Sequence, residues 1–143
     1  MTEDSRRRNI AHEVRRGDES LESAEILLAA GKHADAVSRA YYGAFHYARA
    51  LLLTLGEEAR SHGGLERLLQ RDLVRPGKLD PDVARLFSRL QRFRQDADYT
   101  AEFVFTAKGS REEVDAARQF VEAARMLLVQ GGWIELDKGE EAV

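Results

Sequence analysis

The stretch AVSRAYYGAFHYARALLLTLG, residues 36–56, decides the fold, because it predicts a helix with apolar side chains on every side. Phe45, Tyr47 and Leu52 lie off the main apolar stripe of this helix, which is predicted over residues 33–55. A helix that is apolar all round is surrounded by neighbours. We therefore expect it at the centre of a bundle. The stripe itself recurs in steps of three and four and consists of Ala34, Val37, Tyr41, Ala44, Ala48, Leu51 and Leu55.

Two further helices are predicted on either side of this segment. One covers residues 5–30 and ends at Gly31, a residue that commonly terminates helices. A shorter one begins near Ser61, whose hydroxyl is suited to capping it. The stretch EFVFT, residues 102–106, is the only candidate strand, and it is too short and isolated to build a sheet.

The last two predicted helices have clear N-terminal signals. Pro81 suits the first position of a fourth helix that is capped by Asp80 and runs to about residue 99. Ser110 and Glu113 match a capping box, which predicts that a fifth helix starts there and runs to about residue 130. The fold class expected is therefore all-α, an up-and-down bundle of four to five helices.

Length and composition favour one helical domain over residues 1–143, with a frayed tail from about residue 135. Hydrophobic residues make up 43% of the chain and charged residues 33%. The absence of cysteine excludes disulfides, zinc ribbons and thiol catalysis. No apolar run reaches the roughly 18 residues of a membrane span, and the N-terminus lacks the apolar region of a secretory signal. We expect a cytoplasmic protein with no membrane association.

The net charge of −3 conceals a cationic middle segment. Residues 60–94 contain nine Lys or Arg and four acids, a net charge of +5, so the rest of the chain carries −8. Such a segment is typical of a nucleic-acid footprint or of a surface for an acidic partner. It is equally typical of a solvated, arginine-rich helix face.

The four histidines do not have the spacing of metal ligands, so neither a metal nor a cofactor is expected. His46 lies one turn after Tyr42 and is more typical of a hydrogen-bonded core residue than of a catalyst. The stretch SHGGLERL, residues 61–68, places two glycines at a helix start, where a phosphate can approach. It matches neither a P-loop nor a dinucleotide fingerprint.

Arg94 is an anomaly, because it falls on the apolar stripe of the fourth helix with Phe87 and Leu90. A buried charge without a partner is costly, so this guanidinium needs either a partner or access to solvent. One interpretation is a structural ion pair with Asp98, four residues later, with the side chain reaching outward. The other is an arginine that projects into a groove or a subunit seam and holds phosphate.

The central stretch, followed by SHGG and then by FRQDADY at residues 93–99, resembles the small stand-alone prokaryotic HEPN-domain proteins. The resemblance covers roughly residues 20–124. It implies a four- or five-helix bundle that forms a homodimer with a two-fold seam. Many members of the family are metal-independent endoribonucleases, and many of these are toxins paired with a nucleotidyltransferase-type antitoxin.

The family motif is an arginine, four to six residues, and then a histidine that shuttles protons while the arginine stabilises phosphate. The resemblance places the arginine at Arg94 and the histidine at Tyr99, so the histidine is missing, and windows one or two residues longer give Thr100 and Ala101. A free tyrosine has a pKa near 10 and is a poor base at pH 7. In some paired toxins the antitoxin adenylylates a tyrosine at the place of Ala101.

Three functions follow from this resemblance. The first is a homodimer that binds RNA or a nucleotide in a cationic groove between subunits. The second is an active ribonuclease toxin in which Asp98 and Tyr99 replace the histidine. The third is a module that docks a nucleotidyltransferase or another partner. The candidate catalytic residues are Arg94, Asp98 and Tyr99, and the candidate binding residues are Arg94, Tyr99, Tyr42, His46 and Arg89.

Overall fold

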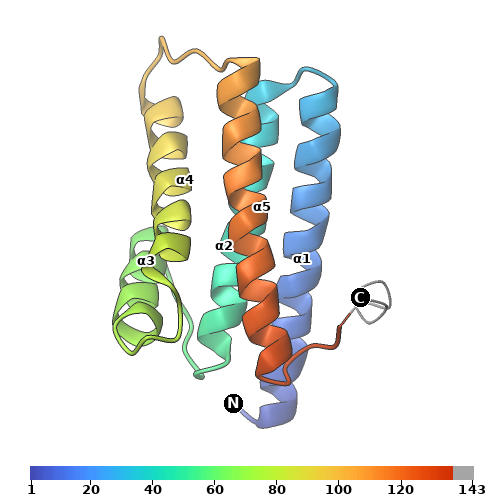
Figure 1. Ribbon diagram of the computed structural model, residues 1–143, viewed down its shortest axis with the longest axis vertical. Helices are drawn as coiled ribbons and strands as arrows, with labels where there is room; N and C mark the ends of the chain where they lie inside the picture. The colour runs from blue at the N-terminus through green and yellow to red at the C-terminus, as the bar shows by residue number, and fades with distance from the viewer. Residues whose placement is uncertain (137–143) are drawn as a thin grey trace.

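The structure, a computed structural model, describes residues 1–136 and is all-helical over that range. Long helices that follow one another along the chain run in opposite directions, which confirms the predicted up-and-down bundle (Figure 1). The candidate strand at residues 102–106 is part of a loop. The elements are α1 (Glu3–Ala29), α2 (His33–Leu53), α3 (His62–Leu69), the π-helical turn η1 (Gln70–Val74), α4 (Pro81–Tyr99) and α5 (Ala107–Gln130).

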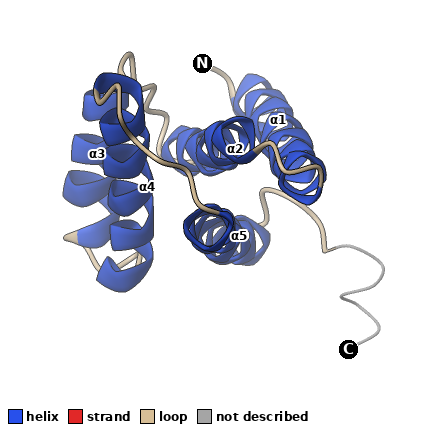
Figure 2. Ribbon diagram, turned by 90° about the horizontal axis from the view of Figure 1, so that it is seen from above, coloured by secondary structure: helices blue, strands red, loops and turns tan. Residues whose placement is uncertain are grey.

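Helix α2 lies at the centre of the bundle, as the apolar pattern predicts. It packs against α1 and α5 on one side and against α3 and α4 on the other, which Figure 2 shows in a view along the bundle. Twelve of its 21 residues are buried, on all sides of the helix. The position of this helix matters for function, because the side chains that it sends toward α3 and α4 form the candidate site described below.

A close approach of α1 and α2 holds the other side of the bundle together. A Cβ atom added at Gly17 would lie 2.6 Å from the ring of Tyr47, so only glycine allows this contact. The Tyr47 ring is fully buried, and its hydroxyl donates a hydrogen bond to Asp18 Oδ1 at 2.6 Å. The buried polar end of this tyrosine is therefore satisfied, as a polar group without solvent contact requires.

The helix ends follow the sequence signals in three places and depart from them in one. Ser61 and Asp80 cap α3 and α4 through their side chains, as predicted. Gly31, after α1, has a φ of 78°, a conformation that favours glycine. The capping box at Ser110 and Glu113 is wrong, because α5 begins earlier and is capped by Thr106, whose hydroxyl accepts from Gly109 N.

Ser110 and Glu113 lie inside α5 and are 0% and 3% exposed. Glu113 pairs with Arg89 of α4 at 2.9 Å, so its acidic side chain serves a contact between helices and not a helix end. Burial raises the pKa of the Glu113 carboxyl above its ordinary value, while the Arg89 guanidinium acts in the opposite direction. A pattern of two residues could not distinguish this arrangement from a capping box.

Within residues 1–136, no helix combines the length and apolar character needed to cross a membrane. The same part of the chain contains no group of three or more His, Cys, Asp or Glu side chains placed to hold a metal ion. The predicted frayed tail begins at about residue 135, and most of it lies outside the described residues.

Candidate functional site

Three aromatic side chains of α2 and one imidazole from the start of α3 form an aromatic cluster, which consists of Tyr41, Tyr42, Phe45 and His62. The His62 ring lies 4.8 Å from the Phe45 ring and 5.6 Å from the Tyr41 ring, measured between centroids. The Tyr41 and Tyr42 rings meet edge to face at 5.4 Å. The cluster is continuous with the core, because Tyr41 also lies 5.9 Å from Phe87 of α4. Tyr41 is fully buried, whereas the other three members are partly exposed.

The guanidinium of Arg94 lies over this cluster. Its central carbon is 4.9 Å from the centroid of the Tyr41 ring and 5.2 Å from that of the Tyr42 ring, distances typical of cation–π contacts. Its Nη2 donates a hydrogen bond to the Tyr42 hydroxyl at 3.1 Å. Helix α4 thus places an arginine on the apolar stripe because two tyrosines of α2 offer it a polarised surface and a hydrogen-bond acceptor.

The ion-pair interpretation of Arg94 describes part of the arrangement, whereas the phosphate-holding role stays a prediction. Asp98 lies at 3.8 Å from Nε, so the predicted ion pair is present, but Asp98 is 56% exposed. An ion pair that is half exposed to solvent contributes little to stability and leaves much of the positive charge available. The Arg94 side chain is itself 26% exposed, so it reaches solvent at the edge of the aromatic cluster.

Beneath Arg94, the hydroxyl of Tyr41 and Nδ1 of His62 lie 2.5 Å apart. Burial raises the pKa of Tyr41 to about 12, although the charge of Arg94 acts in the opposite direction. Burial, and then the charge of Arg94, lower the pKa of His62 below its ordinary value. Near neutral pH the phenol is therefore protonated and the imidazole is uncharged.

Two more arginines border the cluster. The guanidinium carbon of Arg39 lies 5.0 Å from the centroid of the Tyr42 ring, and that of Arg49 lies 5.7 Å from the centroid of the Phe45 ring. Arg49 also pairs with Glu13 of α1 at 3.5 Å, whereas no carboxylate pairs with Arg39 among the residues described. Arg39 and Arg94 thus both place positive charge close to the Tyr42 ring.

A family model for the HEPN domain matches residues 11–130, which is most of the chain. The chain belongs to the HEPN domain family. A UPF0332 protein from Thermotoga maritima is 29% identical over 114 residues, 80% of this chain and 86% of the relative. A protein from Methanocaldococcus jannaschii named "Putative toxin MJ0605" is 33% identical over 115 residues, 78% of this chain and 82% of the relative.

The candidate site residues chosen from the sequence are only partly gathered at the aromatic cluster. Arg94, Asp98 and Tyr42 lie together there. Tyr99 is 88% exposed and makes no recorded contact with Arg94. Nδ1 of His46 lies 2.7 Å from Oε2 of Glu13 on α1, so His46 is hydrogen-bonded, as expected from the sequence. Arg89 pairs with Glu113.

Two members of the cluster, Tyr41 and His62, are absent from the sequence-based list of site residues. Tyr41 falls on the central stripe of α2, so periodicity assigns it to the core. His62 follows the capping serine of a short helix, and its distance of 32 residues from Arg94 hides their proximity. The glycines of the SHGG stretch suggested a phosphate site. In the structure, it is the histidine beside them that reaches the cluster.

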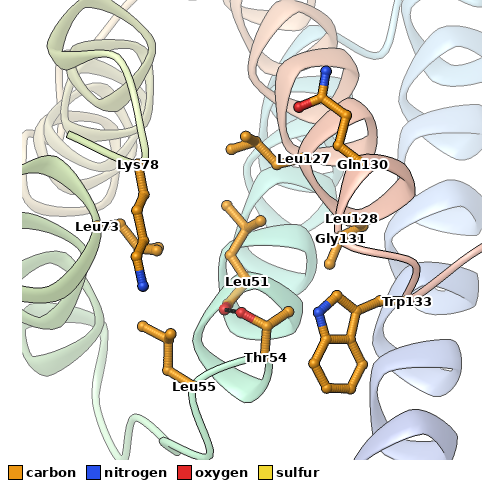
Figure 3. A pocket seen from close by; sticks show the side chains of 10 residues that line it. All are labelled: Leu51, Thr54, Leu55, Leu73, Lys78, Leu127, Leu128, Gln130, Gly131 and Trp133. Carbon is orange, nitrogen blue, oxygen red and sulfur yellow. Dashed lines mark hydrogen bonds between the residues drawn. The ribbon is translucent and has the colours of Figure 1, made fainter. Parts of the chain in front are cut away.

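Several pockets lie outside the cluster, and two of them bear on what the protein could bind. A polar one of about 280 Å³ continues from Arg39 along the groove between α1 and α2 and is lined by Arg16, Glu19, Ser20, Ser23, Arg39 and His46. An apolar one of about 440 Å³ lies where α2 and α5 end, with Lys78 as its only charged lining residue (Figure 3). The polar pocket extends the cationic edge of the cluster, whereas the apolar pocket has one cation, Lys78, to meet a phosphate.

Proposed function

We propose that this HEPN protein is a homodimer that binds RNA, or a nucleotide derived from it, at the aromatic cluster. The observation that supports this most is the position of Arg94, whose guanidinium carbon lies 4.9 and 5.2 Å from the centroids of two tyrosine rings while part of the side chain meets solvent. A planar guanidinium with five donors suits the oxygens of a phosphate. Partly exposed aromatic rings beside it can stack on bases, which is a common mode of single-strand recognition.

Binding is favoured over cleavage in this proposal. Tyr99 stands where the family motif has its proton-shuttling histidine, and its side chain is 88% exposed to solvent. Asp98 is close enough to neutralise part of the Arg94 charge, but a carboxylate in that place repels a phosphate more than it activates a ribose hydroxyl. Ribonuclease activity by the motif's usual route is therefore expected to be weak or absent.

The proposal predicts salt-dependent RNA binding in which Arg39 takes part. Titration of the protein with a fluorescent single-stranded RNA at about 50 and 200 mM salt is expected to show affinity that falls as salt rises, because cations that neutralise phosphates release counterions. Arg39→Ala should weaken binding and lower the salt slope by about one. Arg85→Ala is the matched control, since Arg85 pairs with Asp82 at the far end of α4. No affinity at the lower salt concentration would contradict the proposal.

The dimer is proposed to form through the C-terminal end of α4 and the loop that follows. Tyr99 and Val104 there are 88% and 75% exposed, and large apolar surfaces of this kind commonly mark contacts with other chains. A two-fold contact at this end would bring two Arg94 side chains toward one groove.

Light scattering at micromolar concentration is expected to give twice the mass of one chain. Val104→Asp should shift the protein toward the monomer, because a carboxylate would be buried in the contact. Ile26→Asp is the control, since Ile26 of α1 is 63% exposed but lies elsewhere on the bundle. A monomeric wild type, or equal dissociation of both variants, would count against this seam.

The name of the archaeal relative supports placing this protein among toxin-related HEPN proteins. A small nucleotidyltransferase-type protein is the partner that the family suggests. Such a partner would bind without excluding the RNA site, since the resemblance gives both roles to one bundle.

A further inference from the structure

The hydrogen bonding of the Tyr41 hydroxyl determines which ring nitrogen of His62 carries a hydrogen. This hydroxyl is buried and interacts with two groups, Arg94 and His62. Arg94 can only donate to it, because a guanidinium has no acceptor. The phenol proton therefore goes to Nδ1 of His62, the one acceptor recorded for it among residues 1–136. Leaving that proton unpaired in the interior would be unfavourable.

This bond fixes where the imidazole carries its own proton. A neutral imidazole has one donor nitrogen and one acceptor nitrogen, so a ring that accepts at Nδ1 carries its hydrogen on Nε2. Within the described chain, Nε2 of His62 makes no hydrogen bond. It is also not fully enclosed by protein atoms. The Nε2–H group of His62 therefore meets solvent.

The surroundings of His62 leave this donor open to a ligand. His62 is the first residue of α3, and a side chain added at Gly63 would meet no atom within 4 Å, so the space beside it is free. Glu66, one turn along α3, is hydrogen-bonded to Ser88 of α4, and no carboxylate in the described chain pairs with the imidazole. The nearest charge is Arg94, which lies over the same two tyrosines that flank His62.

We propose that His62, held in the Nε2–H form by Tyr41, is a second ligand-binding donor of this site and contacts a phosphate oxygen of the RNA that Arg94 binds. The inference rests on the proposed RNA binding. Tyr41 is a positioning residue in it, since it acts through the imidazole. His62 differs in role from the histidine of the family motif, because neither ring nitrogen offers a free lone pair to take a proton from a ribose hydroxyl. The site is thus built to hold a phosphate.

Nitrogen-15 NMR of the full-length chain without RNA tests the arrangement directly. At pH 7 the His62 ring, assigned with the His62→Gln variant, is expected to be protonated at Nε2 only. Tyr41→Phe should admit a measurable share of the Nδ1–H form, because the bond that excludes it is lost. Phenylalanine keeps the ring and its packing, so this change is assigned to the missing hydroxyl once circular dichroism shows an unchanged fold. Protonation at Nδ1 in the wild type, or a doubly protonated ring at pH 7, would overturn the inference.

RNA titration then tests the donor. His62→Leu keeps apolar packing against Phe45 but has no donor, and it should weaken binding about tenfold or more, as expected for a hydrogen bond to a charged oxygen. His62→Gln can place an amide N–H near the position of Nε2 and should stay within about threefold of the wild type. His12→Leu, an exposed histidine of α1, is the control. Binding that His62→Leu leaves unchanged would overturn the role of His62 alone, whereas absence of RNA binding by the wild type would overturn the proposed function as well.

Discussion

Replacement of Phe87 by alanine is expected to lower the free energy of unfolding by about 3 to 5 kcal/mol, the usual range for a buried aromatic side chain. Phe87 is fully buried on α4 and lies 5.5 Å from the Phe120 ring of α5 and 5.9 Å from the Tyr41 ring of α2. It therefore joins three helices at one point. Since domains of this size are stable by about 5 to 15 kcal/mol, a large share of the total would be lost.

Phe93→Ala is the matched control for Phe87→Ala. Phe93 lies on the same helix but is only partly buried and packs on the loop residues Phe103 and Phe105, so a smaller loss of about 1 to 2 kcal/mol is expected. Urea denaturation followed by circular dichroism measures both variants. Equal losses of unfolding free energy in the two variants would contradict the view that Phe87 is the main contact holding α4 in the bundle. The comparison also concerns function, because Phe87 supports the Tyr41 ring under Arg94.

The sequence predicted the helices well because apolar periodicity and helix caps are local signals. The apolar character of residues 33–55 placed α2 at the centre, and Ser61 and Asp80 each mark the start of a helix. The capping box at Ser110 failed because α5 begins earlier, with Thr106 as its cap, and Glu113 is used for a contact between helices, which depends on the position of Arg89 on α4. Local patterns do not contain that information.

The candidate site was predictable only in part, for the same reason. Arg94 was identifiable because a charge on an apolar stripe needs an explanation, and Asp98 because it lies one helical turn away. Tyr42 was found by its place on the central helix. Tyr41 and His62 could not be predicted, since the first has the pattern of a core residue and the second reaches the cluster only through the packing of α3 on α2. The chemistry of the site thus depends on tertiary contacts between residues that lie far apart in the sequence.

Replacement of Arg94 by leucine is expected to reduce RNA affinity by about tenfold to a hundredfold while leaving the fold intact. The affinity loss corresponds to about 1 to 3 kcal/mol for an arginine contact with phosphate or base. The loss of stability should stay within about 2 kcal/mol, because leucine suits the apolar stripe and offsets part of the lost contacts with Asp98 and the two tyrosine rings. Arg92→Leu is the control, since Arg92 lies on the same helix, carries the same charge and is exposed.

Arg94→Lys separates the charge of the side chain from its shape. Lysine keeps the positive charge, so the salt slope of RNA binding should stay close to that of the wild type, whereas leucine should lower it by about one. Lysine lacks the planar guanidinium and its forked donors, so affinity should still fall, by less than in the leucine variant. If instead Arg94→Leu lowers stability by several kcal/mol and leaves RNA affinity equal to that of Arg92→Leu, the guanidinium is a structural link between α2 and α4. The hydrogen bond to Tyr42 would then be its purpose, and the RNA site would have to lie elsewhere on the bundle.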